Sequence, residues 1–245
     1  MGVLSVAICK SANVHRPHLK AKSVSKPLHF PGLKLPFVLD TSELPEVILQ
    51  VGDANDLFSQ FLFEWLNEQV IVGSVIYVSF GTQAGLLENQ LNEVILGLEQ
   101  AGVPFVLVVM RLNTWSPPNG LEEKLKGKSI VTKEWVDQHQ ILSHRAVGGF
   151  MSHCGWNSVI ESISAGVPIL AWPMFAEQCL NAKLVVEGLG AGLEIKKVPD
   201  QLGLGIEVLK QAICAGVREL MLGSEKGRNA KKRAQALGRL ACHAV

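Results

Sequence analysis

Short apolar runs alternate with segments of helical periodicity from about residue 70 onward. Each run is bounded by polar or turn-forming residues, which is the pattern of a strand buried on both faces. We expect these strands at Val75–Phe80, Phe105–Met110, Ser129–Thr132, Val147–Met151, Ile169–Trp172 and Gly192–Ile195. Apolar strands that alternate with helices predict an α/β fold, a Rossmann-like doubly wound domain whose parallel sheet carries helices on both faces.

The segments between these strands have apolar residues that recur every three or four positions, as in amphipathic helices. We expect helices at Glu88–Ala101, Gln138–Ser143, Asn157–Ala165, Glu177–Glu187, Ile206–Leu222 and Glu225–Ala241. Residues 10–56 are different, because they hold many prolines and show no clear alternation of elements. The pattern therefore separates an irregular first part from a regular α/β part.

Composition argues against several classes of protein. The 245 residues are 48% hydrophobic with a formal net charge of +1, which predicts a globular core and gives no electrostatic reason to expect nucleic acid as a partner. The basic residues between Lys226 and Arg239 fall on a helical pattern, and a solvated helix face explains them better than a binding patch. No apolar run is long enough for a membrane span, and the first residues do not form a signal peptide.

The five cysteines are scattered and odd in number, with no C-x-x-C spacing. This favours free thiols in a reducing compartment, so we expect a cytoplasmic protein. Cys154 lies next to His153, but no third ligand stands at a suitable spacing, and the chain has no D-x-D pair for a divalent ion. We therefore expect neither a metal nor a cofactor.

Four of the predicted strands end in polar or aromatic residues. Gly81 and Thr82 follow the first strand, Trp135 the third and His153 the fourth, and Glu177 and Gln178 follow the fifth strand after a short loop. In an open parallel sheet, ligands bind beyond the carboxyl ends of the strands. The sequence therefore predicts that these four exits line a single cleft.

The segment after His153 opens a predicted helix and contains Gly155, Asn157 and Ser158. A helix N-terminus offers unpaired N–H groups and a positive dipole end, and glycine lets the backbone approach a ligand closely, so the segment suits a diphosphate. Asn157 or Ser158 could instead serve only as the N-cap of the helix. The two roles are compatible, and the neighbouring residues favour the ligand.

Two further positions have competing interpretations. Ser158 to Glu161 fits the S-x-x-E capping box, a structural role, but a carboxylate one turn into the helix could instead accept the hydroxyls of a ribose. Trp135, taken alone, is more typical of a core residue than of a platform on which a base stacks. The stretch Gly188–Gly192 follows a helix and is not G-x-G-x-x-G, which argues against an NAD-dependent dehydrogenase.

Residues 135–178, with Trp135 first, His153 to Ser158 and Glu161 in the middle, and Glu177-Gln178 last, resemble the donor-binding signature of plant UDP-dependent glycosyltransferases of small molecules. The resemblance implies family 1 and the GT-B architecture of two facing Rossmann-like domains. It also implies an inverting, metal-independent enzyme that transfers a sugar from UDP to a hydroxyl of a small lipophilic acceptor.

The resemblance implies a role for each site residue. Trp135 stacks on the uracil, with Val136 and Gln138 at the edge of the base, and Glu161 binds the ribose. The helix opening, His153 and Thr82 hold the diphosphate, and Trp156 lies near the sugar and phosphate. Glu177 and Gln178 bind the sugar hydroxyls, and a glutamine at position 178 favours glucose over galactose.

The resemblance also predicts a truncated member of the family. Residues 1–57 are similar to part of the acceptor-binding domain and linker, and residues 58–245 to the donor-binding domain. The family's base histidine lies near the start of its first domain, and His15, His18 and His29 do not match it. We therefore assign no catalytic residue, and the alternative function is a UDP-sugar-binding module without turnover that needs a separate acceptor domain.

Overall fold

The computed structural model describes residues 57–81, 86–110, 115–199 and 206–243. The chain divides into two compact units, Met1–Gln60 and Phe61–Val245, and the second contains the α/β domain. The predicted remnant of an acceptor domain, residues 1–57, falls almost wholly outside the described residues, so the boundary at 57/58 stays a prediction. The described part includes no helix that is long and apolar enough to cross a membrane.

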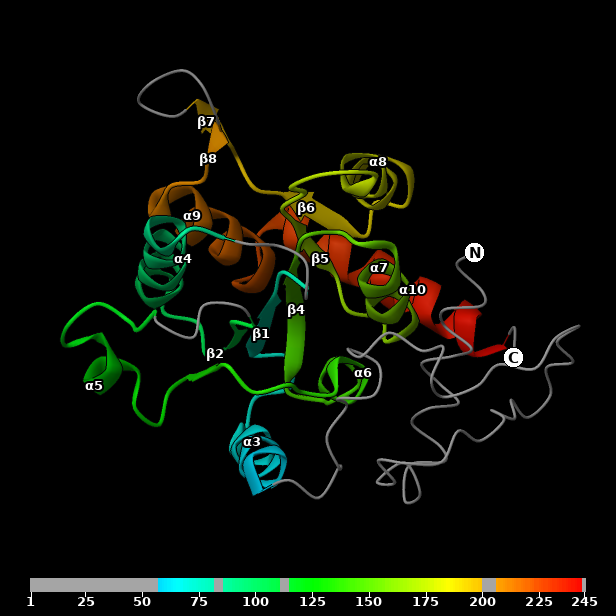
Figure 1. Ribbon diagram of the computed structural model, residues 1–245. Coiled ribbons are helices and arrows are strands. Elements are labelled where there is room, and N and C mark those ends of the chain that lie inside the picture. The colour runs from blue at the N-terminus through cyan, green and yellow to red at the C-terminus, as the bar shows by residue number, and fades with distance from the viewer. Residues whose placement is uncertain (1–56, 82–85, 111–114, 200–205, 244–245) are drawn as a thin grey trace, which may run out of the picture. The chain divides into compact units, whose positions relative to one another are not determined.

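The core of the domain is a parallel sheet of six strands in the order β3-β2-β1-β4-β5-β6 (Figure 1). The strands are β1 (Val75–Ser79), β2 (Phe105–Val108), β3 (Ile130–Thr132), β4 (Val147–Ser152), β5 (Ile169–Ala171) and β6 (Gly192–Glu194). All of β1, β2, β4 and β5 is buried, which explains why these strands are apolar throughout. The predicted Rossmann-like, doubly wound fold is confirmed.

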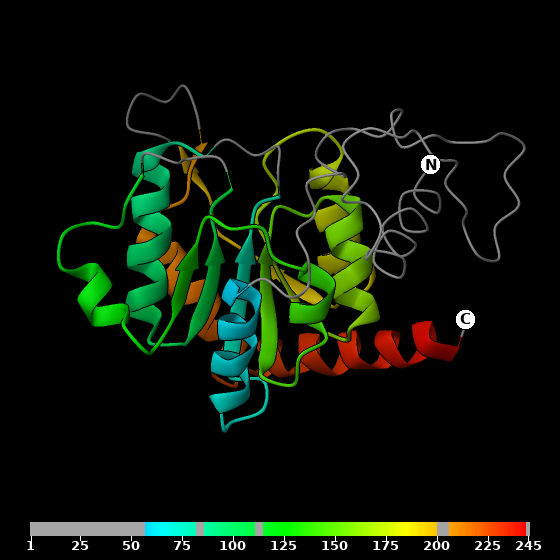
Figure 2. The same cartoon turned by 60° about the horizontal axis from the view of Figure 1, so that its bottom comes forward.

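Helices cover both faces of the sheet, as the views in Figures 1 and 2 show. The helical elements are α3 (Leu57–Glu68), α4 (Glu88–Ala101), α5 (Leu121–Leu125), α6 (Gln138–Leu142), α7 (Trp156–Ser164), α8 (Gln178–Lys183), the π-helical turn η3 (Leu184–Gly188), α9 (Lys210–Met221) and α10 (Glu225–His243). Alternate side chains of each strand point to opposite faces. Ile76 and Val78 pack in the cluster with α4 and α9, whereas Ile169 and Ala171 pack in the cluster with α7 and α8.

The predicted helix at Ile206–Leu222 begins later than expected, at Lys210. Ile206–Glu207 forms a short strand, β8, that pairs antiparallel with β7 (Val198–Pro199). Side chains of α4 fix this start, because Gln90 bonds both the N–H and the carbonyl of Val208, at 3.2 and 2.7 Å. The carboxylate of Glu93 also accepts the N–H of Lys210 at 2.6 Å. These bonds hold the chain extended up to the first turn of α9.

Candidate functional site

The strand order reverses between β1 and β4, which makes this pair the topological switch point of the sheet. Ligands of doubly wound folds bind at this point, beyond the carboxyl ends of the strands, here called the carboxyl edge. Gly81 follows β1 at this edge, and His153 and Gly155 follow β4. The structure therefore brings two of the four predicted strand exits to the position that the fold favours for a ligand.

The ring of His153 fills the space between the loops after β1 and β4. A Cβ atom on Gly81 would lie 2.8 Å from Cε1 of the imidazole, and a Cβ atom on Gly155 would lie 2.5 Å from Nε2. Any larger residue at either position would push the ring out. Gly81 also has a φ of 73°, so both space and backbone conformation call for glycine there.

His153 is held in its neutral form. Burial lowers the pKa of its imidazole below the ordinary value, and the backbone of Ser79 and the Glu177 carboxylate only partly oppose that effect. Nδ1 of the ring is buried and has no hydrogen-bond partner among the described residues. A neutral imidazole donates one hydrogen bond, and an arriving anion would raise its pKa.

Helix α7 begins at Trp156, with Gly155 as its N-cap and no side-chain capping bond. The interpretation of Asn157 or Ser158 as an N-cap is wrong, because both lie inside the first turn. Asn157 is exposed and Ser158 is buried. Since a glycine N-cap has no side chain to accept from the first-turn N–H groups, those donors are left to the backbone, water or a ligand.

The capping box predicted from Ser158 to Glu161 is also wrong, because Ser158 is not the N-cap. The Glu161 carboxylate instead accepts a hydrogen bond of 2.8 Å from Nε2 of Gln138, and the hydroxyl of Ser158 accepts one of 3.1 Å from the same nitrogen. Burial raises the pKa of the Glu161 carboxyl, and the bond from Gln138 opposes that rise. Three predicted site residues from α6 and α7 thus form one hydrogen-bonded group.

Trp135 and Val136 lie in the loop between β3 and α6. The Trp135 side chain is half-buried, whereas the side chain of Val136 is only 6% exposed. Any contact of Val136 with the edge of a base would therefore be made by its backbone. Asp137 caps α6 by accepting the N–H of Gln140 at 3.1 Å, which fixes the start of the helix that carries Gln138.

Gln178 is the first residue of α8, and its side chain is only 4% exposed. Its Oε1 accepts two backbone N–H groups, from Met174 at 3.0 Å and from Phe175 at 3.2 Å. The amide therefore anchors the loop after β5, and only its Nε2 remains available to a ligand. Glu177 is the N-cap of α8 and is exposed.

Two residues that hold these loops, Ser152 and Asn181, were not predicted from the sequence. Ser152, Asn181 and the backbone of Cys154 form hydrogen bonds around the turn between β4 and α7. Ser152 ends β4, whereas Asn181 lies within a predicted helix and carries no motif that marks it. Thr82 lies outside the described residues. In the described ranges, no three His, Cys, Asp or Glu side chains gather closely enough to hold a metal ion.

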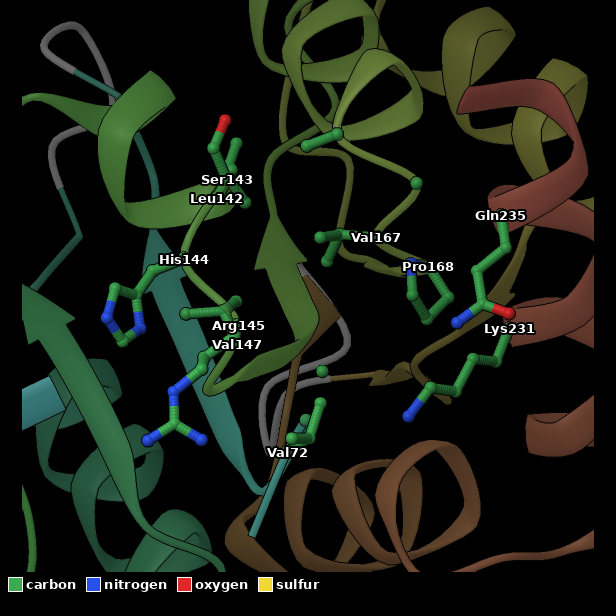
Figure 3. Close-up of a pocket in the computed structure, with 14 residues that line it drawn as sticks. Val72, Leu142, Ser143, His144, Arg145, Val147, Val167, Pro168, Lys231 and Gln235 are labelled. Atoms are coloured by element: carbon green, nitrogen blue, oxygen red, sulfur yellow. The ribbon is translucent and has the colours of Figure 1, made fainter. Parts of the chain in front are cut away.

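A cavity of about 210 Å³ lies at the opposite edge of the sheet, where the strands begin (Figure 3). Arg145 lines it from the loop before β4, and Lys231 and Gln235 line it from α10. None of the predicted site residues contributes to it. Helices α6 and α7 end beside it, and their C-cap residues, Ser143 and Ala165, are among its lining residues.

A family model described as UDP-glucoronosyl and UDP-glucosyl transferase matches residues 51–201. Among curated proteins, UDP-glycosyltransferase 73C12 of Barbarea vulgaris is 38% identical over 205 residues, which cover 79% of this chain and 41% of the relative. UDP-glycosyltransferase 73C7 of Arabidopsis thaliana is 40% identical over 79% of this chain and 42% of its own length. The chain thus spans about two-fifths of the length of these relatives.

Solved structures give the same result. The chain is similar to Phytolacca americana UGT2 complexed with UDP-2fluoro-glucose and pterostilbene, with 38% identity and a TM-score of 0.66 over 74% of this chain and 39% of that one. It is also similar to a ugt transferase from Siraitia grosvenorii in complex with UDP, with 31% identity and a TM-score of 0.66 over 75% of this chain and 45% of that one.

Proposed function

This chain belongs to the UDP-glucoronosyl and UDP-glucosyl transferase family, and from that membership we propose that it binds a UDP-sugar at the carboxyl edge of its sheet. One observation carries the proposal. The switch point of the sheet holds a helix N-terminus without a side-chain cap beside the neutral His153 ring, and one turn further along the helix lies the Glu161 carboxylate. A diphosphate next to a ribose fits that order of groups.

The proposed roles follow the loops in turn. Trp135 stacks on the uracil, the backbone of Val136 meets the edge of the base, and the group formed by Gln138, Ser158 and Glu161 binds the ribose. The diphosphate lies against Gly155, Asn157 and the His153 ring, with Thr82 and Trp156 beside it. Glu177 and Nε2 of Gln178 bind the sugar hydroxyls.

In the proposed reaction, an acceptor hydroxyl oxygen attacks the anomeric carbon of the sugar and the bond to UDP breaks, with inversion at that carbon. The leaving diphosphate gains negative charge, which the α7 N-terminus and the His153 donor stabilise without a metal ion. The acceptor proton goes to a base in the acceptor-binding half of the protein. This chain's described residues supply no such base, so no residue here is assigned to that step.

The donor sugar is glucose and the acceptor is a small lipophilic hydroxyl compound. Phytolacca americana UGT2 is described with a fluoroglucose donor and pterostilbene, which supports both choices by similarity. A cytoplasmic location fits the free thiols of Cys154, Cys179, Cys214 and Cys242, and the low net charge gives no reason for a nucleic-acid partner.

A second candidate is a UDP-sugar-binding module without turnover. It is favoured by the base, because no described residue is assigned to take the acceptor proton. The experiment that separates the two supplies UDP-glucose and a phenolic acceptor and measures glucoside by mass spectrometry. Glucoside formation establishes the transferase, whereas saturable UDP-glucose binding without product establishes the module. If the chain neither binds UDP-glucose nor forms product, both candidates are wrong.

A further inference from the structure

The turn between β4 and α7 has an unusual backbone conformation at Cys154. The φ angle of this residue is 63°, in the left-handed region that a residue with a Cβ atom rarely adopts. The cysteine is fully buried, and burial raises the pKa of its thiol to about 12, so the group stays protonated and inert. Because the left-handed conformation of Cys154 is strained, contacts that hold the turn must offset that strain.

The Cys154 thiol donates to the Ser152 carbonyl at 3.6 Å, and two further side chains hold the turn through hydrogen bonds. The Ser152 hydroxyl accepts the N–H of Cys154 at 3.1 Å, within the turn itself. Nδ2 of Asn181 donates to the Cys154 carbonyl at 2.9 Å and comes from α8, a separate element. Asn181 is 9% exposed, so this bond is shielded from water and its loss would leave a buried carbonyl unpaired.

The bond from Asn181 decides which way the next peptide group faces. The peptide between Cys154 and Gly155 is trans, so its N–H points opposite to its C=O. Because Asn181 draws the carbonyl toward α8, the Gly155 N–H points away from that helix. Within the described residues, no backbone carbonyl accepts a hydrogen bond from this N–H. Gly155 stands directly before the first turn of α7, and a Cβ atom on it would lie 2.5 Å from Nε2 of His153.

We propose that Asn181 is a positioning residue for the diphosphate site, which it serves by fixing the Cys154 carbonyl so that the Gly155 N–H and the α7 N-terminus face the ligand. This inference rests on the proposed function, because it concerns the same site. Asn181 itself does not touch the nucleotide. Without the hydrogen bond from Asn181, Cys154 relaxes toward a right-handed conformation, which turns the Gly155 N–H away from the ligand.

The test is a double-mutant cycle on UDP affinity, measured by calorimetry. Asn181→Leu removes the donor at similar volume, and we expect it to weaken UDP binding about tenfold, a change typical of one lost buried hydrogen bond. Cys154→Gly removes the Cβ atom that makes the left-handed conformation unfavourable. In that background, Asn181→Leu should weaken binding by less than about threefold, because glycine has no preference for the relaxed conformation.

Ser162→Ala is the matched control. The Ser162 hydroxyl donates to the Val167 carbonyl at 2.8 Å, a buried side-chain bond at the far end of α7. We expect Ser162→Ala to lower the melting temperature without weakening UDP binding. If Asn181 has a purely structural role, Asn181→Leu should lower the melting temperature without weakening UDP binding, or should weaken UDP binding equally in the unmutated chain and in Cys154→Gly. Either outcome overturns the inference. If the unmutated chain does not bind UDP, it is the proposed function that fails.

A second measurement uses the unmutated chain in case Asn181→Leu does not fold. The amide proton of Gly155 should shift in the NMR spectrum and become protected from exchange when UDP is added. The side-chain amide of Asn181 should be protected both with and without UDP. A Gly155 amide that UDP leaves unchanged, in a chain that binds UDP, contradicts the inference.

Discussion

At the scale of single residues, Gln178 is anchored by its oxygen, and the proposed sugar contact uses its nitrogen. Two backbone N–H groups occupy its Oε1, so the amide can turn only one way and presents Nε2 as a donor. Glutamate at this position would keep the two accepted bonds but present an acceptor in place of the donor.

We therefore expect Gln178→Glu to weaken UDP-glucose binding roughly three- to tenfold while UDP binding stays unchanged, because UDP has no sugar. Calorimetry with both ligands measures the difference. Equal losses for UDP and UDP-glucose would contradict the sugar contact. A clear preference for UDP-galactose that Gln178→His leaves unchanged would contradict the choice of glucose as well.

Glu161 tests the proposed ribose contact. Glu161→Gln can still accept the bond from Gln138 but loses the charge, so we expect about tenfold weaker UDP binding with little change in melting temperature. The control ligand is 2′-deoxy-UDP, which lacks one of the two hydroxyls and should be less sensitive to the substitution. If the substitution weakens both ligands equally, Glu161 does not contact the ribose 2′-hydroxyl.

We expect His153 to make donor binding depend on pH. Burial lowers the pKa of the free imidazole, and the bound diphosphate raises it again, so binding takes up a proton at pH values between the two pKa values. Affinity for UDP-glucose, whose diphosphate has no group that titrates near neutrality, should rise as the pH falls from 7.5 toward 5.5. Calorimetry in buffers of different ionisation enthalpy measures the uptake, and His153→Asn should abolish it. Proton release, or uptake that persists in the variant, would contradict this role.

At the scale of elements, the apolar runs predicted all six strands of the parallel sheet in order, since strands buried on both faces carry their signal in their own composition. The predicted start of α9 was wrong because it depends on Gln90, a residue of α4. Gln90 lies 118 residues from Val208 and holds it by hydrogen bonds. The predicted N-cap and capping box were wrong because α7 begins earlier than expected, with Gly155 as its N-cap. Asn181 could not be predicted because its bond joins α8 to a turn 27 residues away, whereas the bond of Ser152 is local but no motif marks it.

Gln90 gives a stability prediction at this scale. Gln90→Leu removes both bonds to Val208, so we expect the free energy of unfolding to fall by about 1–2 kcal/mol in urea titrations, with UDP affinity unchanged. Asn89→Ala is the matched control, since Asn89 is exposed and its side chain bonds only the neighbouring Gln90 N–H. An equal effect of the two substitutions would mean that the bonds to Val208 contribute nothing to stability.

At the scale of the whole molecule, the described residues form a six-stranded sheet with its switch point, and the chain spans about two-fifths of the length of its curated relatives. The residues proposed to bind the donor lie in this one domain, and no acceptor-binding residue is assigned. We therefore expect donor binding by this domain alone.

The most direct test of that account is calorimetry of the unmutated chain with UDP in the presence of a chelator. We expect one UDP to bind per chain without added metal, because the α7 N-terminus and His153 supply the donors that the diphosphate needs. Trp135→Ala should weaken this binding by about 1–3 kcal/mol through the loss of stacking. Absence of binding, or binding that appears only with magnesium or manganese, would contradict the account.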